Sequence, residues 1–188
     1  MFVAFDLPEM VREDIAAWGE GELSDPALRR VAPEALHVTL AFLGNRPLDD
    51  VERIEEAMWE IAETPVLLQL QGPVGRPAHG RPRLVALPVD SPPVEARQRE
   101  LSETLVLEGL YKQESRPFWP HVTVARVRAE GRGSRRPVPV NIPSGASPTA
   151  RIGWFDAVRI SLYRSELQPS GAHYVPLAQV ELPGAGWQ

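Results

Sequence analysis

Residues 37–40 read HVTL, and residues 121–124 read HVTV. The chain has only four histidines among its 188 residues, so two of them stand in nearly identical tetrapeptides. In a β-strand, residues i and i+2 point to the same face. Each tetrapeptide therefore predicts a strand that buries Val38 or Val122 and presents a histidine beside a threonine on the other face.

The repetition gives this pattern its chemical meaning. One copy would carry little weight, because a half-buried strand often holds a merely solvated histidine. Imidazole takes up and releases protons near neutral pH, so His37 and His121 on opposite sides of a phosphorus atom would act as acid and base together. The hydroxyls of Thr39 and Thr123 would hydrogen-bond the non-bridging oxygens as charge grows there. The pattern favours in-line phosphoryl transfer that requires no metal.

Other kinds of site fit the sequence less well. The chain has no cysteine, which excludes disulfides, thiolate zinc sites and cysteine nucleophiles. It has no closely spaced histidine pair of the kind that binds zinc, no G-x-S-x-G nucleophile motif and no Walker-type phosphate loop. We therefore expect neither a metal nor a cofactor.

Composition limits the class of protein. A hydrophobic fraction of 43% in a chain of this length fits a single domain over residues 1–188, or two lobes sharing a core. The net charge of −5 disfavours coating long nucleic acid but permits a pocket for one phosphate. Arginines cluster in residues 76–83 and 126–136, where they could line an RNA path. The absence of cysteine, of an export signal and of a long apolar run predicts a cytoplasmic protein outside membranes.

Hydrophobic periodicity predicts an α+β fold of two similar lobes, each with an antiparallel-rich sheet, helices and one H-x-T-x strand. The expected strands are 2–7, 36–44, 66–74, 83–89, 117–127, 153–167 and 173–182. The expected helices are 8–19, a short one after Ser24-Asp25-Pro26, 47–63 and 93–110. The expected inward residues of the last two helices are Leu48, Val51, Ile54, Met58, Ile61, Val94, Leu101, Leu105 and Val106. Residues 129–150 are predicted to form a long, mobile surface loop.

Four segments together resemble the 2H phosphoesterases, and more closely the bacterial and archaeal RNA 2′,3′-cyclic phosphodiesterases, also called 2′-5′ RNA ligases. The segments are FVAFDLP (2–8), LHVTLAFLG (36–44), RPFWPHVTVAR (116–126) and SLYRSELQPSGAHYVPL (161–177). The resemblance implies a bilobal α+β fold with the two motifs facing a central groove. It also implies an enzyme that opens the terminal 2′,3′-cyclic phosphate of RNA 3′ ends or nucleotides and leaves a 2′-phosphate.

The resemblance also implies roles for single residues. His37 would protonate the departing 3′ oxygen, and His121 would activate water. Thr39 and Thr123 would hold the phosphate, and Arg126 would lie near it. Strand parity places Arg126 on the face opposite His121, so that it needs a strand end or a bulge to reach the groove.

The sequence allows two roles for each of two aromatic residues beside the motifs. The family often has Arg or Lys where Trp119 stands, which weakens the picture of a basic groove. Trp119 could stack on a base or be an interfacial residue, and Phe42 could stack on a base or belong to the core.

Two other functions remain open. One is RNA ligation, in which the same acid and base join a 2′,3′-cyclic phosphate to a 5′-hydroxyl. The other is a non-catalytic module that binds nucleotides or RNA ends. Because no apolar stripe is left over, we expect a monomer.

Overall fold

The computed structural model describes residues 1–131, 133–143, 147–168 and 171–184. The helices are α1 (Glu9–Glu22), α2 (Val51–Glu60), α3 (Pro92–Leu107) and α4 (Thr149–Ile152), with 3-10 turns at Pro33–Ala35 and Leu48–Asp50. The strands are β1 (Phe2–Asp6), β2 (Leu28–Arg30), β3 (His37–Phe42), β4 (Leu67–Leu70), β5 (Val74–Arg76), β6 (Leu84–Asp90), β7 (His121–Val127), β8 (Trp154–Asp156), β9 (Arg159–Gln168) and β10 (Gly171–Glu181).

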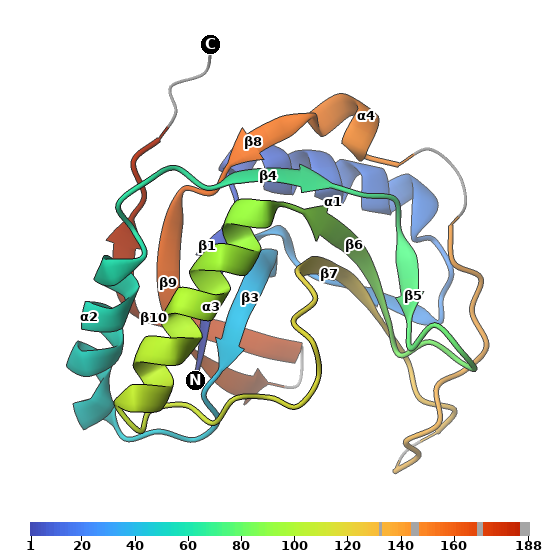
Figure 1. Ribbon diagram of the computed structural model, residues 1–188. Coiled ribbons are helices and arrows are strands. Elements are labelled where there is room, and N and C mark those ends of the chain that lie inside the picture. Colours follow the sequence, from blue (N-terminus) through green and yellow to red (C-terminus); the bar gives the residue numbers. More distant parts are fainter. Residues whose placement is uncertain (132, 144–146, 169–170, 185–188) are drawn as a thin grey trace.

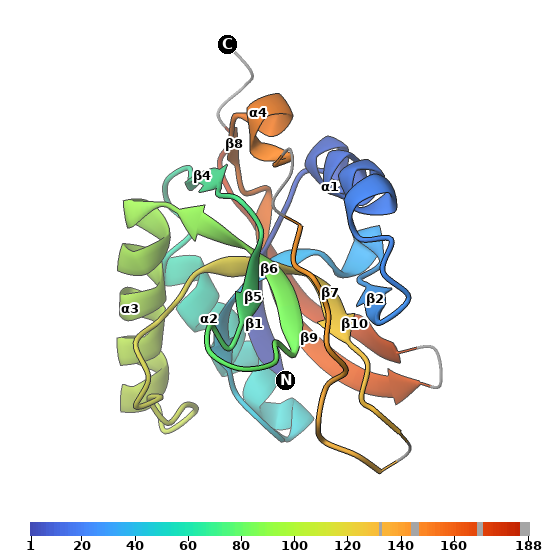
Figure 2. The same cartoon turned by 90° about the vertical axis from the view of Figure 1, so that its right-hand side faces the viewer.

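The strands form one curled sheet (Figures 1 and 2). Its order is β10-β9-β1-β3-β7-β6-β4-β8, with β2 also beside β7 and β5 beside β6. Every pairing between these strands is antiparallel. β3 and β7, which carry the two tetrapeptides, are neighbours near the middle of this order. The predicted α+β class with an antiparallel-rich sheet is confirmed.

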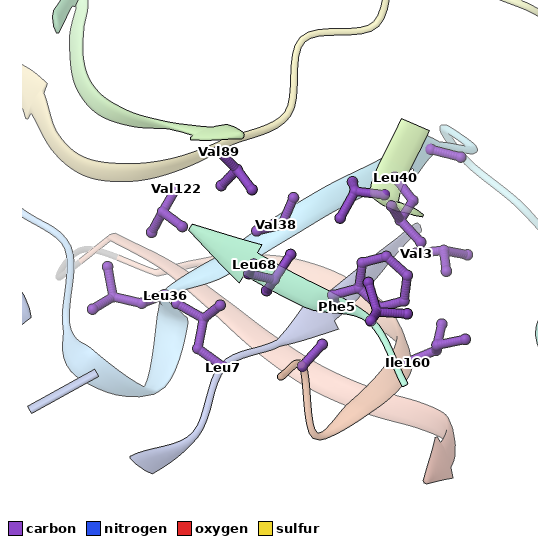
Figure 3. Packing of buried hydrophobic residues seen from close by; sticks show 14 of the residues in the cluster. Val3, Phe5, Leu7, Leu36, Val38, Leu40, Leu68, Val89, Val122 and Ile160 are labelled. Atoms are coloured by element: carbon purple, nitrogen blue, oxygen red, sulfur yellow. The ribbon is translucent and has the colours of Figure 1, made fainter. Parts of the chain in front are cut away.

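One face of the sheet is buried in a continuous apolar core. Val38 and Val122, at the centre of the two motifs, are fully buried there (Figure 3). The inward sides of the helices complete the core, with Ile15 from α1, Met58 from α2 and Leu101 from α3. Since alternate residues of a strand point to opposite faces, burying the valines turns His37, Thr39, His121 and Thr123 away from the core.

The internal repeat spans two strands in each half of the sheet. FVAF (2–5) of β1 pairs with HVTLAF (37–42) of β3 in the register in which LVAL (84–87) of β6 pairs with HVTVAR (121–126) of β7. In both pairs an alanine lies opposite the motif threonine. β3 and β7 then meet at Val38 and Val122, so each repeat meets its own equivalent residue. The two strand pairs are therefore related by an approximate two-fold axis through this contact.

Several sequence expectations about single elements are wrong. The segment after Ser24-Asp25-Pro26 is a turn followed by strand β2, because Leu28 is buried and β2 pairs with the end of β7. The Asp25 side chain accepts a hydrogen bond from the Ala27 amide at 2.8 Å, which fixes that turn. Leu48 is 59% exposed because it lies in the 3-10 turn before α2 rather than on the helix, and Val106, near the end of α3, is 42% exposed.

Two predicted strands are each divided in the structure. The segment 66–74 contains β4 and β5, both of which pair with β6. The segment 153–167 contains β8, which pairs with β4, and β9, which pairs with β1 and β10. In the predicted loop 129–150, the described residues include a bridge between Ala129 and Pro137 and the start of α4. Residues 132 and 144–146 of this loop lie outside the described residues, as do residues 169 and 170 of the predicted closing turn.

No described helix has the length and hydropathy needed to cross a membrane. Large hydrophobic side chains that stay exposed include Phe42, Leu48, Trp59 and Leu107. The monomeric state stays a prediction.

Candidate active site

The two H-x-T motifs come together where β3 meets β7. Val38 and Val122 are direct antiparallel partners, and continuing this register sets His37 opposite Thr123 and Thr39 opposite His121. The two histidines are then diagonal neighbours, about 7–8 Å apart in a regular ladder. All four polar side chains are half-buried on one face. We call His37, Thr39, His121 and Thr123 the quartet.

Each motif strand has one extra residue directly after its threonine. In β3, Thr39 pairs with Ala4 and Ala41 pairs with Val3, so Leu40 has no partner of its own. In β7, Thr123 pairs with Ala86 and Ala125 pairs with Val85, so Val124 has none. Both are β-bulges, and a bulge reverses the parity of the residues that follow it.

The two bulges bring a further residue of each strand onto the face of the quartet. Beyond the bulges, Phe42 is 62% exposed in β3 and Arg126 is exposed in β7. The positive charge of Arg126 lowers the pKa of both histidines, which requires it to lie near both of them. The bulge at Val124 therefore turns Arg126 onto the face of the quartet, which regular strand alternation would not allow. Phe42 is its counterpart in the other repeat.

Matching hydrogen bonds orient the two imidazoles. His37 Nδ1 lies 2.8 Å from the carbonyl oxygen of Ala35, and His121 Nδ1 lies 2.7 Å from that of Trp119. A carbonyl can only accept, so Nδ1 carries the proton in both rings. In a neutral ring Nε2 is then the free base. His37 Nε2 lies 3.0 Å from Thr39 Oγ1, whose hydroxyl donates to it.

Both histidines are held in the neutral form. Burial is the main cause that lowers the pKa of His37 to about 4; the hydrogen bond to the Ala35 carbonyl opposes this, and electrostatic repulsion from His121 and Arg126 adds to it. Burial also lowers the pKa of His121, with added contributions from Arg76 and Arg126. A bound anion would offset these positive charges and raise both pKa values. The site is therefore poised to gain a proton when a phosphate binds.

Aromatic rings surround His37. The ring of Phe2 stacks on it at a centroid distance of 5.0 Å, and Tyr174 meets it edge-on at 5.3 Å. Tyr163 lies behind, 5.4 Å from Phe2 and 6.3 Å from His37. Phe42, Phe2 and Tyr163 are direct cross-strand partners on β3, β1 and β9. This side of the quartet, which we call the aromatic row, is apolar and uncharged.

A half-buried carboxylate supports the aromatic row. Asp6 accepts hydrogen bonds from Ser161 at 2.8 Å and from the Tyr163 hydroxyl at 2.9 Å, and it lies 3.4 Å from Arg159. Burial raises the pKa of Asp6, although these three partners oppose that rise. Burial and the Asp6 charge raise the pKa of Tyr163 to about 12, so its hydroxyl stays a donor. The network fixes Tyr163 and joins β1 to β9.

The side of His121 is cationic. Trp119 stacks on His121 with centroids 4.1 Å apart, and the Arg76 guanidinium lies 4.2 Å from the centre of the same indole. The direct cross-strand partners on β5, β6, β7 and β2 are Arg76, Leu84, Arg126 and Arg29. Cross-strand partners share a face, so three arginines lie in one row. We call Arg76, Arg126 and Arg29 the arginine row.

Sequence reasoning identified the quartet and missed much of its surroundings. Arg76 and Arg29 were not singled out as site residues, because Arg76 lies far from the motifs in sequence and Arg29 fell in a segment predicted to be helical. The repeat of FVAF and LVAL could have located β1 and β6, the strands that pair with the two motif strands. His79 and His173 are exposed and are not among the residues that contact the quartet. Among the residues that the structure describes, no group of three or more His, Asp or Glu is placed to hold a metal ion.

A sequence model of the 2′-5′ RNA ligase superfamily matches residues 7–135, which is more than half of the chain. The chain belongs to the 2′-5′ RNA ligase superfamily. This confirms the resemblance read from the sequence. The match covers both motif strands, and so the quartet lies within it.

Members of the superfamily that resemble this chain are named for one activity. A protein of Escherichia coli named RNA 2′,3′-cyclic phosphodiesterase is 31% identical over 180 residues, covering 94% of this chain and 93% of that protein. A protein of the same name from Thermus thermophilus is 30% identical, covering 98% and 90%.

Solved structures of superfamily members confirm the fold. TT0787 of Thermus thermophilus superposes with a TM-score of 0.79 at 27% identity and covers 98% of each chain. The E. coli protein LigT, solved in complex with 3′-AMP, superposes with a TM-score of 0.73 at 26% identity and covers 96% of each chain. The fold of this chain is therefore the bilobal 2H phosphoesterase fold that the sequence predicted.

Proposed function

We propose that this protein hydrolyses terminal 2′,3′-cyclic phosphates of RNA to 2′-phosphates. The observation that carries the proposal is the quartet itself, in which two histidines with unprotonated Nε2 atoms and two threonines share one face across the β3–β7 contact. Relatives named RNA 2′,3′-cyclic phosphodiesterase support the choice of substrate. A reducing cytoplasm fits this role.

The cyclic phosphate would lie over the β3–β7 contact. The hydroxyls of Thr39 and Thr123 donate to its two non-bridging oxygens, and Arg126 balances its negative charge. In the free protein the Thr39 hydroxyl donates to His37 Nε2, and it can turn to the phosphate once that nitrogen carries a proton. Donors held this close to the developing charge stabilise the transition state. Because charge on the phosphorus oxygens is met by hydroxyls and a guanidinium, this proposal needs no metal.

Two proton transfers complete the reaction. His121 Nε2 takes a proton from water as the water oxygen bonds to phosphorus. His37 Nε2 gives its proton to the 3′ oxygen as the bond from phosphorus to that oxygen breaks. The products are a 2′-phosphate and a 3′-hydroxyl. The two histidines end with their protonation states exchanged, and solvent resets them.

The low pKa of His37 in the free protein bears on its role as acid. A pKa of about 4 leaves the ring unprotonated near neutral pH, which alone would suit a base. The bound phosphodiester brings a negative charge beside Nε2 and raises this pKa. The assignment of acid to His37 and base to His121 rests on the family likeness.

The flanks of the quartet suggest how the nucleoside lies. Phe42 is exposed beside the aromatic row and offers a face on which a base can stack. Trp119 is stacked on His121 and lies under Arg76, so its role in this proposal is to hold the His121 ring in place. We thus assign base stacking to Phe42 rather than to Trp119.

RNA ligation would use the same groups with a different nucleophile. With a 5′-hydroxyl in place of water, His121 would activate that hydroxyl and the same bond to the 3′ oxygen would break. The superfamily takes its name from this activity. Water at high concentration favours hydrolysis when both nucleophiles compete.

The deciding experiment uses a 2′,3′-cyclic mononucleotide, with the product identified by phosphorus NMR. We expect a 2′-phosphate. A 3′-phosphate would reverse the two histidine roles, and tight binding without turnover would indicate a binding module. As matched controls, His79→Ala and His173→Ala should keep full activity, because both residues are exposed away from the quartet. Adding a 5′-hydroxyl RNA tests ligation through the appearance of a joined product.

A further inference from the structure

Two arginine-rich segments that are distant in sequence form one pocket at an end of the sheet. The β5–β6 loop contributes Arg81 and Arg83, and the loop after β7 contributes Arg135 and Arg136. With Pro77, His79 and Pro137 they line a wide, shallow cavity of about 540 Å³ that is open to solvent. The two loops run beside each other at the lower right of Figure 1 and at the bottom of Figure 2. We call this cavity the two-loop pocket.

Specific contacts hold the two loops together. Arg81 forms an ion pair with Glu130 and donates a hydrogen bond to the carbonyl of Pro137 at 3.1 Å. Arg136 also lies near Glu130, at 3.7 Å. The amide of Val127 bonds to the carbonyl of Arg83 at 2.9 Å, which ties the base of one loop to the other. The pocket is therefore a built feature of the fold.

The pocket keeps a strong positive charge. Its four arginines face one nearby carboxylate, Glu130, which pairs with Arg81 and Arg136. Among the described residues, no carboxylate pairs with the guanidinium of Arg83 or Arg135. In a chain with a net charge of −5, such a concentration of unneutralised arginine is a local feature that favours an anionic ligand.

The pocket continues the arginine row away from the quartet. Arg76 ends β5, where the first loop begins, and Arg126 lies just before the end of β7, where the second begins. Five residue steps separate the backbone of His121 from that of Arg126, roughly 16 Å of extended strand, so Arg126 reaches the quartet only with its long side chain. The two-loop pocket lies beyond that point, so a phosphate held at the quartet cannot also fill it.

We propose that the two-loop pocket binds phosphodiester groups of the RNA that precede the cyclic end, so that oligonucleotides rather than mononucleotides are the preferred substrates. This inference rests on the proposed function and adds to it a substrate class. The asymmetry of the flanks supports it, because the arginine row and the pocket carry arginines with no carboxylate partner among the described residues, whereas Arg159 and Arg164 on the side of the aromatic row pair with carboxylates. The planar guanidinium of arginine can donate two parallel hydrogen bonds to phosphate oxygens. The anionic RNA backbone would therefore lie along the arginine row and in the pocket.

The test compares two substrates in the purified protein. One is a 2′,3′-cyclic mononucleotide, and the other is an RNA hexanucleotide ending in a 2′,3′-cyclic phosphate. We expect a higher kcat/KM for the hexanucleotide. The double variant Arg83→Gln/Arg135→Gln should lower that value by about tenfold and leave the mononucleotide unchanged, because only the longer substrate reaches the pocket. The log–log salt dependence of hexanucleotide binding should also become shallower by about 1.4, at about 0.7 per lost phosphate contact.

The matched control is Arg99→Gln/Arg151→Gln, which removes the same charge from exposed positions on α3 and α4. It should behave as the unmodified protein with both substrates. Equal losses on both substrates in the pocket variant, or no preference for the hexanucleotide, would overturn the inference. If neither substrate is turned over, the proposed function fails, and anisotropy of a labelled hexanucleotide then tests the pocket alone: equal affinity in the pocket and control variants would reject it.

Discussion

The depressed pKa of His37 predicts a measurable loss of stability in acid. An unfolded histidine has its ordinary pKa of 6.5, whereas His37 in the fold has a pKa of about 4. Between these values the unfolded chain binds the proton that the native protein refuses, so the free energy of unfolding falls as the pH falls from above 6.5 towards 4. From pH 7.5 to pH 5, this one group costs about 2 kcal/mol of stability.

The assay is urea denaturation at the two pH values, for the unmodified protein and for His37→Gln. Glutamine does not titrate, so the variant loses this part of the pH dependence while any loss of ring stacking affects both pH values equally. Asp6, whose pKa is raised, contributes with the opposite sign and cancels in the comparison. We expect the stability difference between the two proteins to shift by about 2 kcal/mol in favour of His37→Gln at pH 5.

Saturating sulfate provides a second measurement, since sulfate stays a dianion over this range. Bound over the quartet, it should raise the pKa of His37 and shrink the pH-dependent shift. If the difference between the two proteins is the same at both pH values without sulfate, His37 is not held neutral by the fold. The conclusion that His37 is neutral in the free protein and gains a proton when an anion binds would then be refuted.

Four further outcomes test the catalytic assignments. His37→Ala and His121→Ala should each lower turnover of a cyclic mononucleotide by about 10²–10⁴, the usual range for one lost acid or base, and a smaller loss in either would remove it from that role. Thr39→Val and Thr123→Val should each cause an intermediate loss of turnover, because a hydroxyl stabilises charge without moving a proton. The rate of product formation in quenched reactions measures this loss. Arg126→Gln should raise KM and lower the salt sensitivity of kcat/KM, and unchanged kinetics would place Arg126 outside the phosphate site. Activity should persist in EDTA, and its loss on chelation with recovery on adding a divalent ion would replace this mechanism by metal catalysis.

The alternation of side chains along a strand predicted the quartet correctly. His37 and Thr39 precede the bulge in β3, as His121 and Thr123 do in β7, so simple parity holds for all four. The burial of Val38 and Val122 follows from the same rule. The shared face of side chains two residues apart is therefore readable from the sequence, and their catalytic roles stay a prediction.

Features that depend on the main chain or on distant segments could not be predicted in the same way. The bulge at Val124 has no characteristic side chain, and without it Arg126 would point into the core. The stack of Arg76, Trp119 and His121 joins β5 to the segment before β7, and only the pairing of β6 with both strands reveals it. Arg29 was hidden because a capping signal near Asp25 suggested a helix, while pairing with β7 imposed a strand.

The two-fold relation of the strand pairs limits how the protein can orient an asymmetric substrate. The quartet looks the same after a half-turn, so by itself it cannot distinguish the 2′ oxygen from the 3′ oxygen of a cyclic phosphate. That choice falls to the residues after the bulges, where one repeat has Phe42 and the other has Arg126. In the proposed reaction, the choice between the two oxygens would therefore depend on the residues in which the two repeats differ, and exchanging Phe42 and Arg126 should reverse the orientation of the substrate over the quartet.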